Sequence, residues 1–391
     1  MKILISGAGI AGPTLAYWLL KHGFEPTLVE RSPRLRTGGY VIDFWGTGYD
    51  VAERMGLLPV LRERGYRVKE VRMVGGGGRR VGGFPVEALA RLADDRFVSI
   101  PRGELAAALY ATIDGRVETL FGDSITSLHD TGTGVRVEFE RSQPGTYGLV
   151  VGADGLHSNV RRIAFGDGGL ERYLGIKVAA FEVAGYHPRD EDVYLMYTRV
   201  GRQLNRFSLR GDRTLFLFMF ADPNPGLPEP GDAAAQKAIL RARFGADGWE
   251  SRRILEALES AEHVYFDRVS QIRMDRWWRG RVTLLGDAAW CVSLLGGQGS
   301  ALAMTGAYVL AGELKNAGGE PELALARYQD RLGGMMAAKQ RAATGMAGFF
   351  VPRSRLRLFL RNQATRLLSV PFLANRLIAG DLLDRFDLPP Y

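Results

Sequence analysis

The chain has 391 residues, of which 46% are apolar and 24% charged, a composition typical of a globular protein with two or three folding units. Its single cysteine, Cys291, excludes an internal disulfide framework, and the widely spaced histidines at 22, 129, 157, 187 and 263 predict no metal site. The net charge of +8 comes from basic residues spread along the chain rather than from a basic stripe, which argues against a nucleic-acid partner.

The chain begins with a pattern typical of a nucleotide-binding unit. Residues 2–6 predict a buried parallel strand, residues 10–22 a helix, and residues 26–29 a second strand that ends at Glu30. A βαβ unit of about 30 residues is the smallest dinucleotide-binding fold. The segment 31–48 that follows is rich in glycine and arginine and has no clear periodicity.

Shorter elements follow as far as residue 153. In chain order we predict short helices near 50–64, a strand near 67–74, a glycine turn at 75–83, an amphipathic helix over 104–113, alternating strands at 121–129 and 134–140, and a buried strand at 149–153.

Between residues 171 and 275 the pattern becomes that of an antiparallel sheet. Alternating, aromatic-rich segments lie at 173–184, 192–199, 203–210 and 214–220, followed by helical segments at 232–244 and 251–260 and a strand near 263–273. Residues 281–285 then restore the buried parallel pattern, so the first unit resumes after an insertion. From residue 299 onward we predict mainly helix, interrupted at Pro321, Pro352 and Pro371.

These elements predict an α/β chain with a Rossmann-type unit, an inserted antiparallel β-sheet unit and C-terminal helices. We expect the first unit at 1–74, 98–170 and 276–335, the second at 75–97 and 171–275, and a bridging helical segment at 336–391. Its arginines (353, 355, 357, 361 and 366) lie among leucines and phenylalanines, which favours packing across both units over contact with a membrane. No apolar stretch reaches 18 residues and no cleavable leader is present, so we expect a cytoplasmic protein.

The strongest motif is Gly7-Ala8-Gly9-Ile10-Ala11-Gly12, which matches the G-x-G-x-x-G fingerprint. Gly7 permits the tight turn, Gly9 lets the backbone approach a pyrophosphate, and Gly12 lets helix and strand pack closely. Glu30 ends the next strand, where its carboxylate would accept hydrogen bonds from ribose hydroxyls. The order strand, glycine loop, helix and carboxylate predicts a dinucleotide site, whereas the pattern alone often marks only a turn.

Two further motifs favour FAD as the dinucleotide. Gly152-Ala153-Asp154-Gly155 and Gly286-Asp287-Ala288-Ala289 each end a predicted strand, and Gly297-Gln298-Gly299 opens a long helix. No second G-x-G-x-x-G occurs, so the chain has no separate nicotinamide-binding unit. Asp287 is placed to bind ribityl hydroxyls, and the helix that begins near Gly299 would stabilise negative charge on a reduced flavin. The motifs give these candidate cofactor contacts: Gly7, Gly9, Ala11, Gly12, Glu30, Arg31, Asp154, Asp287, Gly297, Gly299 and Ser300.

With these motifs the chain resembles the FAD-dependent aromatic hydroxylases, the class A flavoprotein monooxygenases with the p-hydroxybenzoate hydroxylase fold. The loop Gly38-Gly39-Tyr40-Val41-Ile42-Asp43 and the segment Ile100-Pro101-Arg102-Gly103-Glu104-Leu105 resemble the branch that contains tetracycline-inactivating monooxygenases. The resemblance implies that Asp43, Arg102 and Asp287 contact non-covalently bound FAD and that NAD(P)H docks at Arg36.

The chain departs from the family pattern beside the expected flavin. Trp290 replaces a common histidine, Leu294 a common proline and Ala301 a common asparagine. Trp290 and Leu294 would make the surroundings of the ring more apolar. Candidate substrate contacts, each also explicable as core packing, are therefore Trp290, Leu294, Tyr194, Met196, Phe207 and Phe218.

The resemblance implies an NAD(P)H-dependent monooxygenase that hydroxylates an electron-rich, aromatic or polyketide-like small molecule through a flavin C4a-hydroperoxide. No protein acid or base can be named from the sequence, and a monomer or a homodimer fits it equally. A reductase of the same fold remains an alternative, whereas the absence of a Trp-x-Trp pattern disfavours a halogenase. A redox-silent protein that binds FAD or another ligand is the alternative from a different class.

Overall fold

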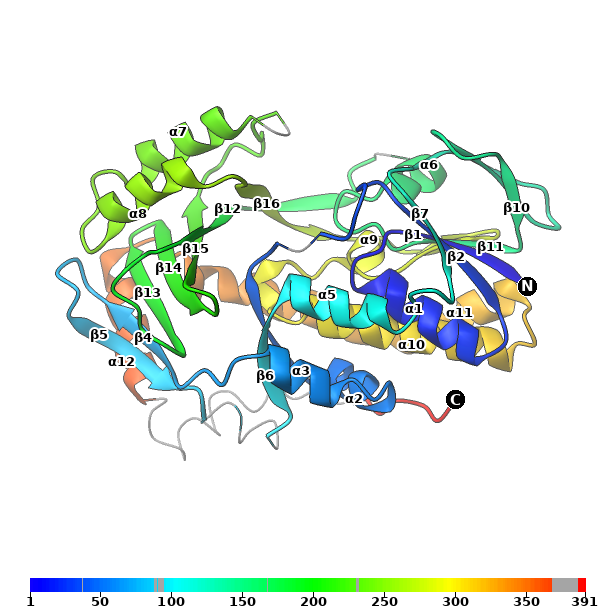
Figure 1. Ribbon diagram of the computed structural model, residues 1–391, viewed down its shortest axis with the longest axis horizontal. Coiled ribbons are helices and arrows are strands. Elements are labelled where there is room, and N and C mark those ends of the chain that lie inside the picture. Colours follow the sequence, from blue (N-terminus) through cyan, green and yellow to red (C-terminus); the bar gives the residue numbers. More distant parts are fainter. Residues whose placement is uncertain (37, 88–89, 91–94, 167, 230–231, 368–385) are drawn as a thin grey trace.

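The computed structural model describes residues 1–36, 38–87, 90, 95–166, 168–229, 232–367 and 386–391. The interruption expected at Pro371, and with it residues 368–385 of the bridging segment, lies outside these residues. A six-stranded sheet and a seven-stranded sheet occupy opposite halves of the molecule, and long helices run beneath both (Figure 1).

The six-stranded sheet is parallel except at one edge. Its strands, in spatial order, are β17 (Trp278–Arg279), β18 (Val282–Leu284), β11 (Leu149–Gly152), β1 (Lys2–Ser6), β2 (Glu25–Glu30) and β7 (Glu118–Phe121). Only the β17–β18 pair is antiparallel among them. Ile3, Leu4 and Ile5 of the central β1 are fully buried, as expected for a strand covered on both faces. After the second sheet the chain returns to this sheet at β18, which pairs in parallel with β11.

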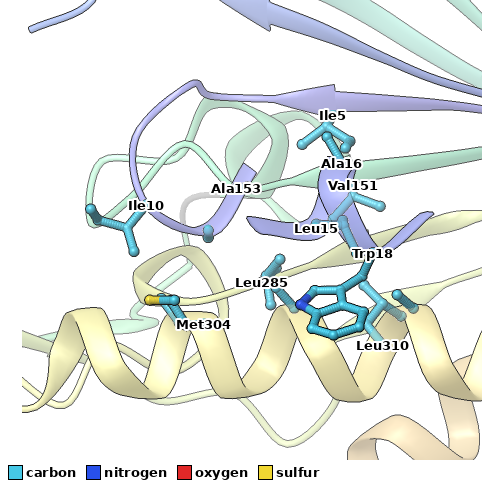
Figure 2. Packing of buried hydrophobic residues seen from close by; sticks show 14 of the residues in the cluster. Ile5, Ile10, Leu15, Ala16, Trp18, Val151, Ala153, Leu285, Met304 and Leu310 are labelled. Atoms are coloured by element: carbon cyan, nitrogen blue, oxygen red, sulfur yellow. The ribbon is translucent and has the colours of Figure 1, made fainter. Parts of the chain in front are cut away.

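One face of this sheet is covered by α1 (Ala11–Lys21) and α10 (Gly299–Asn316), which pack against each other. Figure 2 shows the buried residues between them: Ile5, Ile10, Leu15, Ala16, Trp18, Val151, Ala153, Leu285, Met304 and Leu310. These residues lie in or directly beside β1, β11, β18, α1 and α10. The core therefore fixes the ends of the three strands relative to the N-termini of the two helices.

Smaller elements surround this core. A three-stranded sheet contains β8 (Ile125–Asp130), β9 (Val135–Phe139) and β10 (Gly145–Tyr147), and the helices of this half are α2 (Thr47–Arg54), α3 (Leu58–Arg64), α5 (Arg102–Ala111), α6 (Asn159–Phe165) and α9 (Asp287–Trp290). The segment 31–48, for which no element was predicted, contains β3 (Val41–Trp45). This strand pairs with β6 (Phe97–Pro101) and so brings the Asp43 segment beside the Arg102 helix.

The seven-stranded sheet has the order β16 (Tyr265–Ile272), β12 (Glu171–Ala184), β15 (Arg213–Ala221), β14 (Arg202–Leu209), β13 (Val193–Arg199), β4 (Glu70–Val74) and β5 (Arg80–Pro85). β4 pairs in parallel with β13. The expected unit boundary after residue 74 is therefore wrong for this strand, because its apolar residues extend the second sheet rather than the first.

Helices cover the two faces of this sheet differently. α7 (Ala233–Phe244), α8 (Ser251–Ala257) and the short η1 (Leu258–Ser260) enclose one face in an aromatic core. The opposite face meets α12 (Arg355–Leu367), the far end of α11 (Pro321–Phe350) and the turn η2 (Leu294–Gly296). α11 thus joins the two halves, since its first part packs in the core of the parallel sheet and its last part packs on the antiparallel one (Figure 1).

Within the described part of the chain, no helix has both the length and the apolar character needed to cross a membrane. The same residues contain no group of three or more His, Cys, Asp and Glu side chains arranged to hold a metal ion.

Candidate cofactor and substrate site

The glycine loop after β1 leaves no room for a side chain at two of its glycines. Gly7 has a φ of +108°, and a Cβ there would lie 2.6 Å from the Ala153 carbonyl oxygen. A Cβ on Gly12 would lie 1.9 Å from the carbonyl oxygen of Gly7. The turn and the close packing of helix on strand therefore both require glycine.

The helix that follows this loop offers unpaired backbone donors. α1 begins at Ala11 with Ile10 as its N-cap, and no side chain caps it and no acidic residue lies in its first turn. A Cβ on Gly9 would be 3.7 Å from Nη2 of Arg102, so an arginine approaches the same end of the helix. Free N–H groups, the positive end of a helix dipole and a guanidinium together suit a pyrophosphate.

Glu30 lies at the end of β2 with its carboxylate fixed by the loop. Oε2 accepts a 2.9 Å hydrogen bond from the Ala8 N–H, and Oε1 accepts one of 2.9 Å from the Ser32 N–H. Arg36 approaches Glu30 to 3.9 Å while its own side chain remains 64% exposed, and Arg31 is exposed as well. The exposure leaves Arg36 free to meet a second ligand from solvent.

Asp287 opens α9 directly after the turn at Gly286, whose φ is +66°. Burial raises the pKa of Asp287, while the positive charge of Arg102 and a contact with Cys291 oppose that rise. The position of a Cβ on Gly299 would be 3.7 Å from Oδ1 of Asp287, which places this carboxylate at the N-terminus of α10. Asp287, Arg102 and the two glycine loops thus converge.

Buried polar atoms without partners lie in the loop between α9 and α10 and on β3 beside it. Ser293 Oγ, Gln298 Nε2 and Trp45 Nε1 are all buried and make no hydrogen bond. The position of a Cβ on Gly297 lies 3.5 Å from the Trp45 ring, so these donors surround one loop. Buried polar groups normally have partners, and a heteroaromatic cofactor with polar edges fits these unpaired donors. α10 also begins without a capping side chain, with Ser300 in its first turn.

Asp154 has its carboxylate oxygens occupied by the chain itself. It accepts hydrogen bonds from Ser158 Oγ and from the N–H groups of Asn159 (2.8 Å) and Val160 (3.1 Å). Burial raises the pKa of Asp154. The motif that contains it therefore organises the start of α6, and Arg161 of that helix donates a 3.0 Å bond to the Ala288 carbonyl beside Asp287.

Asp43 connects the cofactor half to the antiparallel sheet. Ser99 Oγ donates a 2.6 Å hydrogen bond to Oδ1 of Asp43, and the Tyr194 hydroxyl lies 3.5 Å from the same atom. Burial raises the pKa of Asp43, and burial also raises the pKa of Tyr194 well above its usual value. The Tyr194 ring lies 4.6 Å from that of Phe207, so the predicted aromatic residues begin next to Asp43.

Three of the six predicted substrate contacts lie on the sheet face that is turned toward the cofactor loops, and a fourth packs against this face from one of those loops. Tyr194, Met196 and Phe207 share one cluster on this face, and Leu294 packs from the loop against a neighbouring cluster with Met219. The register makes Met196, Asn205 and Leu217 neighbours across three strands. This face is apolar and adjoins the loop with the unpaired donors.

The other two predicted substrate contacts are wrong. Phe218 is fully buried on the opposite face, where its ring meets that of Phe244 at 4.9 Å, because alternate residues of a strand point to opposite sides. The Trp290 ring lies 4.5 Å from that of Trp277 and 5.8 Å from that of Tyr328, inside the core of the parallel sheet. Trp290 therefore does not supply the apolar wall that was expected beside the ring.

Sequence reasoning did not assign a role to three residues near the site. Tyr40 lies between Arg102 and Tyr265, and burial raises its pKa to about 12. Trp45 and Asn205 carry buried atoms without partners. Alternation was visible in the sequence around Asn205 but not around Trp45. The face that a strand residue occupies depends on strand register, which the sequence does not determine.

Comparison with known proteins agrees with this geometry. Residues 1–331 match the family described as FAD binding domain. A protein of Mycobacterium tuberculosis (strain CDC 1551 / Oshkosh) is 40% identical over 348 residues, which cover 86% of this chain and 91% of that protein. A flavin-dependent monooxygenase from an unknown prokaryotic organism is 37% identical over 350 residues and 87% of each chain. The solved structure of the tetracycline destructase Tet(55) has a TM-score of 0.84 and 33% identity, and covers 100% of this chain and 98% of its own.

Proposed function

Since this chain belongs to the FAD-binding, flavin-dependent monooxygenase family, we propose that it uses NAD(P)H and O₂ to hydroxylate a flat, electron-rich aromatic or polyketide-like molecule. One observation carries the substrate class: the loop with the unpaired donors packs directly on an apolar sheet face. Leu294 and Leu295 of that loop lie in one cluster with Met219 and Val178 of the sheet. Flat apolar molecules suit such a surface, on which methionine and aromatic side chains adapt and stack.

When bound, FAD would supply the redox chemistry, in which NAD(P)H provides two electrons, one atom of O₂ enters the substrate and the other leaves as water. The residues of this chain would bind the cofactor, orient the substrate and exclude water from the site. The N-terminus of α1 and Arg102 would hold the pyrophosphate, Glu30 the adenosine ribose, and Asp287 the ribityl hydroxyls.

Around the ring, the N-terminus of α10 would favour negative charge on the reduced cofactor, because helix dipoles stabilise anions there. The donors Ser293 Oγ, Gln298 Nε2 and Trp45 Nε1 are available to the polar edges of the ring. The apolar residues Leu294, Met196 and Phe207 would exclude water on the substrate side.

Asp43 and Tyr194 are a pair of ionisable residues at the predicted substrate face. Both have raised pKa values through burial, so both side chains are protonated more readily than when exposed. A protonated Asp43 could hold a proton at Oδ2 while Oδ1 accepts from Ser99.

The reaction is tested by anaerobic stopped-flow reduction of the FAD-loaded protein with NADPH and NADH, against aromatic and aliphatic compounds. Product mass is then measured after turnover in ¹⁸O₂. We expect an aromatic compound to accelerate reduction and its product to gain one labelled oxygen. Stimulation only by small aliphatic acids, or a product that gains hydrogen without oxygen, would favour a reductase of the same fold.

Docking of NAD(P)H is proposed at Arg36. This arginine is exposed beside the glycine loop, and its guanidinium lies 3.9 Å from Glu30. Arg36→Ala should slow reduction of the flavin and raise the concentration of NAD(P)H needed, while FAD content stays unchanged. Arg34→Ala removes an exposed charge two residues away and serves as the control. Equal effects of the two substitutions would show that Arg36 has no special role.

A further inference from the structure

Arg361 on α12 is a buried arginine without a carboxylate partner among the described residues. Its exposure is 8%, and Nη1 donates to Thr198 Oγ1 at 3.2 Å, to Gln203 Oε1 at 3.4 Å and to the Phe349 carbonyl at 3.0 Å. Its Nε and Nη2 donate to Oδ1 of Asn362 on the same helix. All of these acceptors are neutral, and the guanidinium carbon also lies 5.6 Å from the centre of the Phe349 ring, so no anion in the described part of the chain compensates the charge.

Other buried arginines on this sheet are compensated. Arg206, with a side chain only 2% exposed, pairs with Asp190 and Glu250. Burial lowers the pKa of Arg361 to about 10, in the direction expected for a desolvated cation without an anion nearby. An uncompensated buried charge destabilises a folded protein, which makes a ligand anion a physical reason for its presence.

Gln203 supplies a second unsatisfied donor beside Arg361. The residue is 1% exposed, and its Oε1 is already used by Thr198 and Arg361, while Nε2 is buried and has no partner. An amide N–H beside a guanidinium is a suitable donor pair for a carboxylate or another planar anion. Two independent observations, an unpaired charge and an unpaired donor, therefore meet at one place.

The strand register places these donors on the predicted substrate face. Gln203 lies opposite Met219 on β15, and Met219 packs with Leu294 and Leu295 of the cofactor loop. One strand spacing of about 4.8 Å thus separates Gln203 from the residue that contacts this loop. Two residues along β14, Asn205 has a buried Oδ1 without a partner and is a candidate acceptor for a hydroxyl.

We propose that Arg361 and Gln203 form an anion subsite, which binds a carboxylate or an ionised enol carried by the planar substrate. The inference rests on the proposed function in assigning this sheet face to the substrate. It narrows the substrate class from flat apolar molecules to those that carry one acidic group at an edge. No chemistry occurs at this subsite, so Arg361 is a positioning residue.

The test compares two probes with the same ring system, the anionic 1-hydroxy-2-naphthoate and its uncharged methyl ester. Binding to the FAD-loaded protein is measured by perturbation of the flavin absorbance and by the shift in Tm. We expect the acid to bind at least tenfold more tightly than the ester. Arg361→Met should remove this preference and leave the affinity for the ester within about twofold. Arg357→Met, which removes an exposed arginine from the same helix, should leave the preference intact.

A second variant supplies the missing anion from within the chain. Gln203→Glu places a carboxylate beside Arg361, so it should raise the Tm of the ligand-free protein and weaken binding of the acid at least tenfold. It should leave binding of the ester unchanged. A lower Tm in Gln203→Glu, equal binding of acid and ester to the unsubstituted protein, or no binding of either probe would each overturn the proposal.

The outcomes also separate this proposal from the proposed function. A preference for the acid that depends on Arg361, without any ¹⁸O-labelled product, would leave the subsite standing and refute the hydroxylase. The opposite result is labelled product formed equally well from acid and ester by both the unsubstituted protein and Arg361→Met. That result would support the hydroxylase and refute the anion subsite. FAD content, measured for each variant, shows that the fold is retained.

Discussion

The cofactor-binding loops and the substrate-facing sheet depend on the sequence in different ways. In the loops the backbone itself makes the site: Gly7 and Gly12 are glycines because a Cβ would overlap a carbonyl group. On the sheet the side chains make the site, and strand register decides which of them face it. Phe207 and Phe218 are similar residues on neighbouring strands, yet they lie on opposite faces.

This difference determines which parts of a functional site can be inferred from a short stretch of sequence. A site formed by the backbone requires certain residues at fixed spacing. The glycine loop and Gly286-Asp287 can therefore be recognised as motifs in the sequence. A side-chain site on a sheet requires only alternation, which every half-buried strand shows. The two regions should therefore respond differently to substitution.

The largest effect is expected at Gly12. In Gly12→Ala the new Cβ would lie 1.9 Å from the Gly7 carbonyl oxygen, so helix and strand must separate. We expect loss of FAD and a loss of stability of more than about 3 kcal/mol, in the range of strong core disruption. FAD content by absorbance and unfolding by circular dichroism measure both.

Gly334→Ala is the matched control, because this helical glycine is exposed and a Cβ there meets nothing within 4 Å. Alanine is favoured over glycine within helices by about 1 kcal/mol, so this variant should be slightly more stable and retain its FAD. A soluble Gly12→Ala protein with normal FAD content would contradict the close-packing argument.

The next effect separates the two faces of the sheet. Phe218→Leu and Phe207→Leu should each lower the free energy of unfolding by about 1–2 kcal/mol, because both rings are buried. Only Phe207→Leu should also change the affinity for methyl 1-hydroxy-2-naphthoate, measured by flavin absorbance. A change in affinity in Phe218→Leu alone would mean that the ligand binds on the side covered by α7 and α8.

Much of the fold was predictable because hydrophobic periodicity is local. The βαβ start, the inserted sheet and the return at β18 all follow from apolar runs and alternation. The existence of one strand and the pairing of another could not be predicted in this way. β3 lies in a glycine-rich segment without clear alternation, and the partner of β4 is β13, more than a hundred residues later in the chain. Such long-range pairing leaves no local signal.

The candidate site divides in the same way. Glu30 and Asp287 could be placed from motifs, and the structure puts them at strand ends beside glycine turns. Trp290 was misplaced because its position relative to the motif says nothing about the direction of its side chain, which the packing against Trp277 determines. Arg361 stood among several similar arginines, and only tertiary packing distinguishes it by burial.

A smaller effect is expected at Asp287, where a side chain rather than the backbone would bind FAD. Asp287→Ala removes a charge-assisted hydrogen bond of about 1.5–3 kcal/mol, so FAD should bind about 10- to 100-fold more weakly. The apoprotein should remain folded. Asp114→Ala, which removes an exposed carboxylate, is the control. An unchanged dissociation constant for FAD would show that Asp287 is outside the site.

The smallest effect is expected at Asp43, where the two regions meet. Burial raises the pKa of Asp43, so the folded protein holds this proton more tightly than the unfolded chain does. Stability from this group is therefore present at low pH and is lost as the pH rises from the ordinary carboxyl value through the raised one. Asp43→Asn should remove that loss while Asn Oδ1 still accepts from Ser99.

The free energy of unfolding of Asp43→Asn, relative to the unsubstituted protein, should thus increase between pH 4 and pH 7 and favour the variant at pH 7. Urea unfolding at several pH values measures it, and Asp114→Asn is the control for the same change at an exposed position. The same variant decides between two roles. If Asp43→Asn loses FAD and shows no dependence on pH, the carboxylate binds the cofactor. If FAD content is normal and the difference grows with pH, Asp43 belongs with Tyr194 to the substrate side, and the boundary between backbone site and side-chain site lies at β3.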